Sequence, residues 1–284
     1  MNNSTLQKEA VREKYTQIAS QTKDQNASSC CGATGCCDDS LYSIMADSYS
    51  SIDGYQPDAD LGLGCGLPTE FAQIKLGDTV VDLGSGAGND VFIARKLAGP
   101  RGKIVGIDFT DAMIARARTN AETLGLNNVE FRKGDIEDIP MTSNFADVVV
   151  SNCVLNLVPN KHKVFSEIYR ILKPGAHFSI SDIVLEGELP AKWKEVAELY
   201  AGCISGAIQK SDYLSIITEA GFTNIILQKE KPITIPAEIL SEYFSSGEIE
   251  SFEKSNIKIT SITVYAEKPA KDDRNCCEPG SGCC

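Results

Sequence analysis

The chain has 284 residues, of which 42% are hydrophobic and 23% are charged, as in ordinary globular proteins. Its 27 Lys and Arg against 39 Asp and Glu give a net charge of −12, which argues against a nucleic-acid partner because phosphate binding depends on clustered Lys and Arg. It has no apolar run long enough for a transmembrane helix, and its polar N-terminus lacks the apolar core of a signal peptide. We therefore expect a cytoplasmic protein with no membrane partner.

The N-terminal quarter of the chain shows little regular patterning. We expect a helix over residues 5–24, then a loop rich in Ser, Gly and Cys, and a mostly irregular stretch over 42–68.

From Thr79 onward, apolar strands alternate with helical stretches. The expected strands are 79–83, 103–108, 128–131, 146–151 and 176–181, and the helices between them are 89–98, 111–124 and 161–172. Beyond Leu185 we expect helices over 190–209 and 211–220, and strands over 222–229 and 257–267. This alternation predicts an α/β fold with a doubly wound, mostly parallel sheet.

The pattern divides the chain into four regions. They are an N-terminal helix and Cys-containing loop region, a cofactor-binding domain, an insertion with the C-terminal strands, and a Cys-rich tail, over residues 1–74, 75–185, 186–270 and 271–284 respectively.

Eleven cysteines are unusual for a chain of this length. In a secreted protein they would suggest disulfides, but in a reducing compartment they indicate metal or metalloid binding, or redox chemistry. Cys65, Cys153 and Cys203 are isolated along the body of the chain. The other eight form two terminal clusters: Cys30, Cys31, Cys36, Cys37, Cys276, Cys277, Cys283 and Cys284.

A cofactor site is predicted where the strand 79–83 runs into a glycine turn and a helix. Glycines at such a turn allow a ligand to approach the backbone closely. A nicotinamide site shares this feature, but Asp82 just before the turn would repel a pyrophosphate and attract the ammonium and sulfonium groups of S-adenosylmethionine. The expected cofactor residues are Asp82, Gly84, Ser85, Gly86, Gly88, Asp108 for the ribose hydroxyls, Asp135 and Ile136 for the adenine ring, and Asn152.

This arrangement resembles the class I methyltransferases over residues 75–185. The resemblance implies a Rossmann-like sheet that is mostly parallel with one antiparallel strand, and the two late strands suit that ending.

The three isolated cysteines lie where such a fold would place a substrate. Cys153 follows the fourth strand, next to the point at which ligands bind in open α/β sheets. Cys65 and Cys203 are flanked by glycines, which leave a thiol accessible. A single cysteine is more often a small buried apolar residue, and the spacing of these three does not fit a zinc ribbon.

Five segments resemble the arsenite methyltransferases, and the match extends from about Tyr42 to Gln209. The segments are Gly64-Cys65-Gly66, Asp82-Leu83-Gly84-Ser85-Gly86, Gly106-Ile107-Asp108, Ser151-Asn152-Cys153-Val154-Leu155-Asn156-Leu157-Val158-Pro159, and Gly202-Cys203 with Gly206-Ala207. Asn160 departs from the family, which usually has Asp there.

The resemblance implies that Cys153 and Cys203, with Cys65, are catalytic residues that hold As(III) as arsenite or its glutathione conjugate while S-adenosylmethionine donates a methyl group. Soft thiolates suit this soft ion. No general base is needed, since arsenic attacks through a lone pair, and neither His162 nor His177 lies in a catalytic motif. The resemblance also implies repeated methylation for arsenic detoxification, with a disulfide formed by Cys65 and an N-terminal thiol and regenerated by thioredoxin or glutathione.

Two alternatives and one local question stay open at this stage. A carbon or oxygen methyltransferase of a small metabolite, such as a quinone, would share the cofactor site but leave the three cysteines unexplained. A thiol-rich metalloid buffer would explain the terminal clusters but not the intact cofactor pattern. Those clusters could capture As(III) for delivery to the site or bind metal adventitiously.

Overall fold

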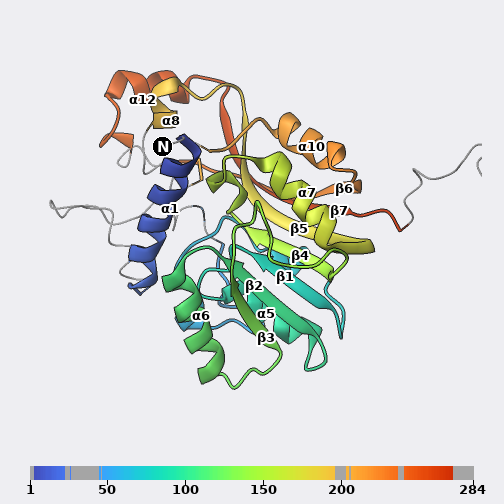
Figure 1. Ribbon diagram of the computed structural model, residues 1–284. Helices are drawn as coiled ribbons and strands as arrows, with labels where there is room; N and C mark the ends of the chain where they lie inside the picture. The colour runs from blue at the N-terminus through green and yellow to red at the C-terminus, as the bar shows by residue number, and fades with distance from the viewer. Residues whose placement is uncertain are drawn as a thin grey trace, which may run out of the picture.

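A computed structural model describes residues 3–22, 26, 45, 47–195, 203, 204, 206–235 and 240–270. Its centre is a seven-stranded sheet in the order β3-β2-β1-β4-β5-β7-β6 (Figure 1). The strands are β1 (Thr79–Leu83), β2 (Lys103–Asp108), β3 (Val129–Lys133), β4 (Ala146–Asn152), β5 (Leu172–Glu186), β6 (Thr223–Pro232) and β7 (Lys258–Glu267).

The sheet is parallel except at one strand. β1 to β5 pair in parallel, whereas β7 runs antiparallel to both of its neighbours, β5 and β6. This confirms the expected class I methyltransferase topology. The chain order of the strands reverses between β1 and β4, so the crevice beyond the carboxyl ends of these strands is where ligands bind in open α/β sheets.

Helices cover both faces of the sheet because alternate residues of each strand are apolar on opposite sides. Val81 and its same-face neighbours pack against α7 (Lys161–Ile171) and α10 (Lys210–Glu219). Val80 faces the opposite core, which is closed by α5 (Asn89–Ala98) and α6 (Asp111–Thr123).

The N-terminal helix α1 (Asn3–Ala19) packs against α6 and so lies over the carboxyl end of the sheet (Figure 1). The shorter elements are η1 (Pro57–Ala59), α4 (Pro68–Phe71), η2 (Leu155–Leu157), α8 (Ala191–Glu195) and α12 (Ser246–Glu253). Within the described ranges, none of the helices has both the length and the apolar composition that a membrane span requires.

Two local predictions need correction. The helix expected over 190–209 is wrong at its end, because Cys203 has a left-handed φ of 65° and Ile208 pairs with β5 through its carbonyl. A left-handed residue does not continue a right-handed helix. Helix α12 was not predicted, although Ser245 and Glu248 form a capping box that is visible in the sequence.

Candidate functional site

A cavity of about 1200 Å³, including its open mouth, lies at the carboxyl ends of β1, β2 and β4. Most of the residues expected at the site line it: Asp82, Gly84, Ser85, Gly86, Asp108, Asp135, Ile136, Asn152, Cys153 and Cys203. Gly88 and Cys65 are not among the lining residues. A side chain at Gly88 would stand 2.9 Å from the Phe131 and Phe92 rings, so its role in the structure is to allow packing at the start of α5.

The glycine turn forms because β1 ends against β2. The backbone N–H groups of Gly84 and Ser85 both donate to the carbonyl of Ile107 on β2, at 2.7 and 3.0 Å. Gly84 has a φ of 72°, and a Cβ there would lie 2.4 Å from Val154. Only glycine fits this position, which leaves the backbone open to the cavity.

Three buried carboxylates give the cavity a negative wall. Burial raises the pKa of Asp82, and the charges of Asp90 and Asp108 raise it further. Burial also raises the pKa of Asp90 and that of Asp108. None of the three forms an ion pair with a described residue. Such a wall favours a cationic ligand, because buried charges are stable when they are paired.

Three further polar atoms at the cavity lack partners. Within the described part of the chain, Ser85 Oγ, Asn89 Oδ1 and Thr110 Oγ1 are buried without a hydrogen bond. Buried polar groups are nearly always bonded to protein, water or ligand. Asp108 accepts from the Gly86 and Thr110 N–H groups at 3.0 and 2.8 Å, so its carboxylate is held towards the cavity. A polar, cationic cofactor such as S-adenosylmethionine fits these residues.

Helix α1 contributes a wall that the sequence reasoning missed. Lys8, Val11 and Tyr15 line the cavity. Lys8 forms ion pairs with Asp135 and Glu137 across the rim. Partial burial opposes the charge of Lys8, but the hydrogen bonds to these carboxylates outweigh it and raise the pKa of the lysine. No local signal links Lys8 to residues about 127 positions away, since only folding brings them together.

The three isolated cysteines converge beside this cavity. Cys65, Cys153 and Cys203 are free, buried and members of one apolar cluster, so the expectation that glycines leave the thiols of Cys65 and Cys203 accessible is wrong. The neighbouring thiols of Cys203 and Cys65, together with burial, raise the pKa of the Cys153 thiol well above the ordinary value. Burial likewise raises the pKa of Cys65. Burial and the neighbouring thiols thus favour the protonated forms of Cys65 and Cys153.

The local backbone positions each thiol. Cys153 follows β4 directly, and its N–H donates to the Ser181 carbonyl on β5 at 2.7 Å. The thiol of Cys203 donates to the Cys153 carbonyl at 2.7 Å. Both residues have left-handed φ angles, 60° and 65°, a conformation that is rare outside glycine and clusters at functional sites.

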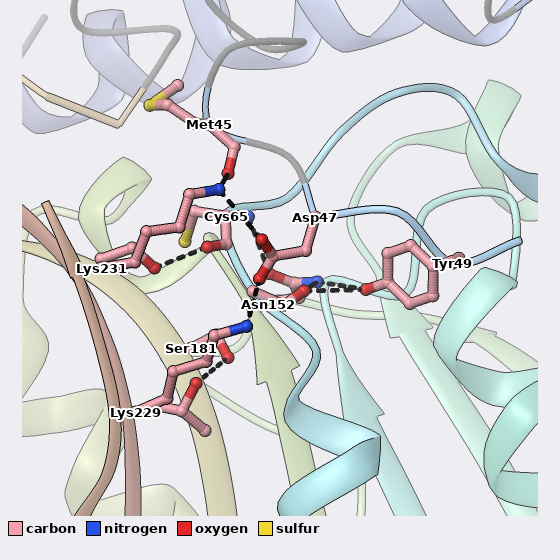
Figure 2. A network of polar contacts seen from close by, with 11 residues as sticks. Met45, Asp47, Tyr49, Cys65, Asn152, Ser181, Lys229 and Lys231 are labelled. Carbon is pink, nitrogen blue, oxygen red and sulfur yellow. Dashed lines mark hydrogen bonds and ion pairs between the residues drawn. The ribbon is translucent and has the colours of Figure 1, made fainter. Parts of the chain in front are cut away.

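Cys65 lies on a loop that is anchored from two sides (Figure 2). Its N–H donates to Asn152 Oδ1 at 3.0 Å, and Ser261 on β7 donates to its carbonyl. Beside it, Asn152 and Tyr49 share the carboxylate of Asp90. Tyr49 and Asp90 were not predicted as site residues, because no motif marks them and their partners are remote in sequence.

The eight cysteines of the terminal clusters, expected as accessory As(III) ligands, lie outside the described residues. Within the described residues, no three His, Cys, Asp or Glu side chains are grouped as a preassembled metal site.

Comparisons with known proteins identify the family of this chain. Residues 74–221 match the methyltransferase domain family. An arsenite methyltransferase of Halobacterium salinarum is 37% identical over 94% of this chain and 68% of its own length, and one of Aquipseudomonas alcaligenes is 33% identical over 82% and 67%.

A solved structure shows the same likeness. The arsenic(III) S-adenosylmethionine methyltransferase of Chlamydomonas reinhardtii aligns with a TM-score of 0.62 at 29% identity, covering 81% of this chain and 73% of that one. With a methyltransferase domain over half of its length and such relatives along nearly all of it, the chain belongs to the arsenite methyltransferase family.

Proposed function

We propose that this protein transfers methyl groups from S-adenosylmethionine to trivalent arsenic. The observation that carries the proposal is the convergence of three free, buried thiols beside a cavity with a carboxylate wall. As(III) is soft and three-coordinate, so thiolates are its preferred ligands. A methyltransferase of a carbon or oxygen substrate needs no such cluster.

The cavity residues hold and orient the cofactor. Asp82 and Asp90 would offer negative charge to its cationic groups, and Asp108 would offer its remaining lone pairs to ribose hydroxyls. Bound S-adenosylmethionine supplies a methyl group on a positively charged sulfur, which makes that carbon electrophilic. Val11 and Tyr15 of α1 close one side of the cavity and limit the access of water.

The thiols present the nucleophile. Cys153 and Cys203 line the cavity, while Cys65 is fully buried and is not part of the lining. Arsenic held by three sulfurs on this side keeps its lone pair opposite to them, turned towards the cavity. The thiols lose their protons as the metalloid binds. Holding the two reacting atoms at attack distance is then the main source of rate enhancement.

No residue is needed to remove a proton from the nucleophile. Consistent with this, neither histidine lines the cavity: His177 bonds to the Ala72 carbonyl, and His162 is exposed beside Glu219.

Turnover requires electrons as well as methyl groups. The arsenic lone pair would bond to the methyl carbon as the carbon–sulfur bond of S-adenosylmethionine breaks and S-adenosylhomocysteine leaves, which would raise arsenic from As(III) to As(V). Two thiols that become a disulfide would supply the two electrons that return it to As(III). We assign this disulfide to Cys65 and an N-terminal cysteine, and its reduction to thioredoxin or glutathione in the cytoplasm.

The terminal cysteine clusters would capture As(III) and deliver it to the site. In the proposed division into four regions, residues 75–185 would bind the cofactor and residues 186–270 would contribute to arsenic binding.

The test is transfer of labelled methyl from S-adenosylmethionine to arsenite in the presence of thiol, with products separated by arsenic speciation. We expect methylated arsenicals that require both substrates. Cofactor binding without methylated arsenic would contradict the proposal and favour a small-metabolite methyltransferase, whereas failure to bind the cofactor would favour a metalloid buffer.

A further inference from the structure

The side-chain amide of Asn152 joins the cofactor cavity to the loop that carries Cys65. Its Oδ1 accepts from the Cys65 N–H at 3.0 Å, and its Nδ2 donates to the Gly66 carbonyl at 2.8 Å. The amide therefore holds the backbone of Cys65 and Gly66 through one donor and one acceptor. The two partners lie 87 positions apart in the sequence.

The loop that carries Cys65 also packs closely against Asn152 and β5. Gly64, which precedes Cys65, has a φ of 103°, and a Cβ there would stand 2.7 Å from Asn152 Nδ2. On the other side, a Cβ at Gly66 would stand 2.5 Å from Ser181 Oγ. The glycines flanking Cys65 thus let its loop approach Asn152 and β5, and explain the Gly-Cys-Gly pattern by packing.

A second set of contacts fixes Asn152 itself (Figure 2). Its Nδ2 also lies 3.3 Å from the Asp90 carboxylate and donates to the Tyr49 hydroxyl. Tyr49 donates to Asp90 at 2.8 Å, and Thr69 donates to the other carboxylate oxygen at 3.0 Å. Because Asp90 lines the cavity, the position of Cys65 is tied to the carboxylate wall that faces the cofactor.

We propose that Asn152 is the positioning residue for Cys65, holding it as the third sulfur ligand of arsenic. This inference rests on the proposed function and adds a substrate distinction to it. Arsenite has three exchangeable oxygens and can take three thiolates, whereas its monomethylated product has two. Misplacing Cys65 therefore slows methyl transfer to arsenite and spares methyl transfer to the monomethylated arsenical, when each is measured in a single turnover that precedes the disulfide step.

The decisive measurement is the number of sulfur atoms around bound arsenic, by X-ray absorption on the cofactor-free protein loaded with one equivalent of arsenite. The full-length chain is used with its eight terminal cysteines replaced to prevent binding there: Cys30→Ser, Cys31→Ser, Cys36→Ser, Cys37→Ser, Cys276→Ser, Cys277→Ser, Cys283→Ser and Cys284→Ser. In this background we expect three sulfur ligands.

Asn152→Ala is expected to leave two sulfurs and one oxygen, with Asn152→Ser as a second variant should the first not fold. Asn128→Ala is the matched control, since Asn128 also donates to two loop carbonyls, those of Gly99 and Gly102, away from the thiols. It should keep three sulfurs. Three sulfurs in the folded Asn152 variant, or two in the background, would overturn the proposal.

The substrate comparison provides the second readout. In single turnovers with arsenite, Asn152→Ala should transfer the methyl group at least about tenfold more slowly, because two hydrogen bonds that hold Cys65 are lost. With the monomethylated As(III) substrate, the rate should change much less. An equal loss on both substrates would mean that Asn152 serves cofactor binding instead. The sulfur count needs no methyl transfer, so it tests Asn152 even if the proposed function fails.

Discussion

Replacing Asp82 with Asn removes one negative charge from the cavity wall and leaves the shape of the side chain nearly unchanged. Asp82 is 3% exposed, and no described residue hydrogen bonds to its carboxylate. Burial and the charges of Asp90 and Asp108 raise its pKa, so the ligand-free protein bears a cost for keeping it ionised. A cationic ligand offsets that cost by pairing with the carboxylate. Asp82→Asn should therefore weaken cofactor binding and stabilise the ligand-free protein.

The expected magnitude follows from the burial and charge of this group. One charge pair about 4 Å apart contributes roughly 4 kcal/mol at an effective dielectric constant of about 20. Burial and repulsion between the carboxylates offset part of this, which leaves about 2 kcal/mol, in the range of hydrogen bonds to charged groups. Asp82→Asn should therefore weaken S-adenosylmethionine binding about 30-fold. The thermal midpoint of the ligand-free protein should rise rather than fall.

Titration calorimetry at pH 8 gives the affinity, and thermal unfolding without ligand gives the second quantity. Asp111→Asn is the control, because this carboxylate is exposed and pairs only with Lys133 among the described residues. It should bind the cofactor like the parent protein. An Asp82→Asn protein that binds within about threefold of the parent would refute the assignment of the carboxylate wall to the cationic cofactor.

Three further outcomes are expected. Cys153→Ser and Cys203→Ser should each abolish arsenite methylation while leaving cofactor affinity unchanged by calorimetry; normal turnover by either would contradict the thiol assignment. Burial raises the pKa of Asp182 from 3.8 to about 7, against the opposing effects of Lys161 and Tyr213. Stability linked to this group is thus present below pH 4 and lost as the pH rises to about 7, by roughly 4 kcal/mol at about 1.4 kcal/mol per unit. In urea unfolding, Asp182→Asn should flatten this fall, and an unchanged slope would refute the linkage. Trp193→Ala should lower the free energy of unfolding by about 3–5 kcal/mol, since the ring is buried between those of Phe244 and Phe252, at 4.4 and 4.0 Å between centroids; a loss under 1 kcal/mol would show that this contact is dispensable.

Local patterns predicted most of the sheet. β1 and β2 coincide with their expected ranges because a continuous Val- and Ile-rich run bounded by turn residues is buried on both faces. The ends of β3 and β5 were misjudged, since pairing with neighbours extends β5 to Leu172–Glu186 beyond its most apolar core. The segment after Cys203 likewise depends on a remote partner: it pairs with Leu185 of β5, and this pairing replaces the expected helix.

The glycine turn, the acidic residues at the ends of β1 and β2, and the thiol after β4 could be predicted from local sequence, because each depends on residues adjacent in the chain. The grouping of Asp90 with Asp82 and Asp108 in one negative wall, the position of Lys8 at the rim and the contact of Asn152 with Cys65 could be seen only in the folded protein. Lys8 and Asp135 are 127 positions apart and Asn152 and Cys65 are 87 apart, and Asp90 is itself bonded to Asn152, 62 positions away. No local sequence pattern predicts these contacts, because they form only after the sheet has brought the carboxyl ends of its strands together.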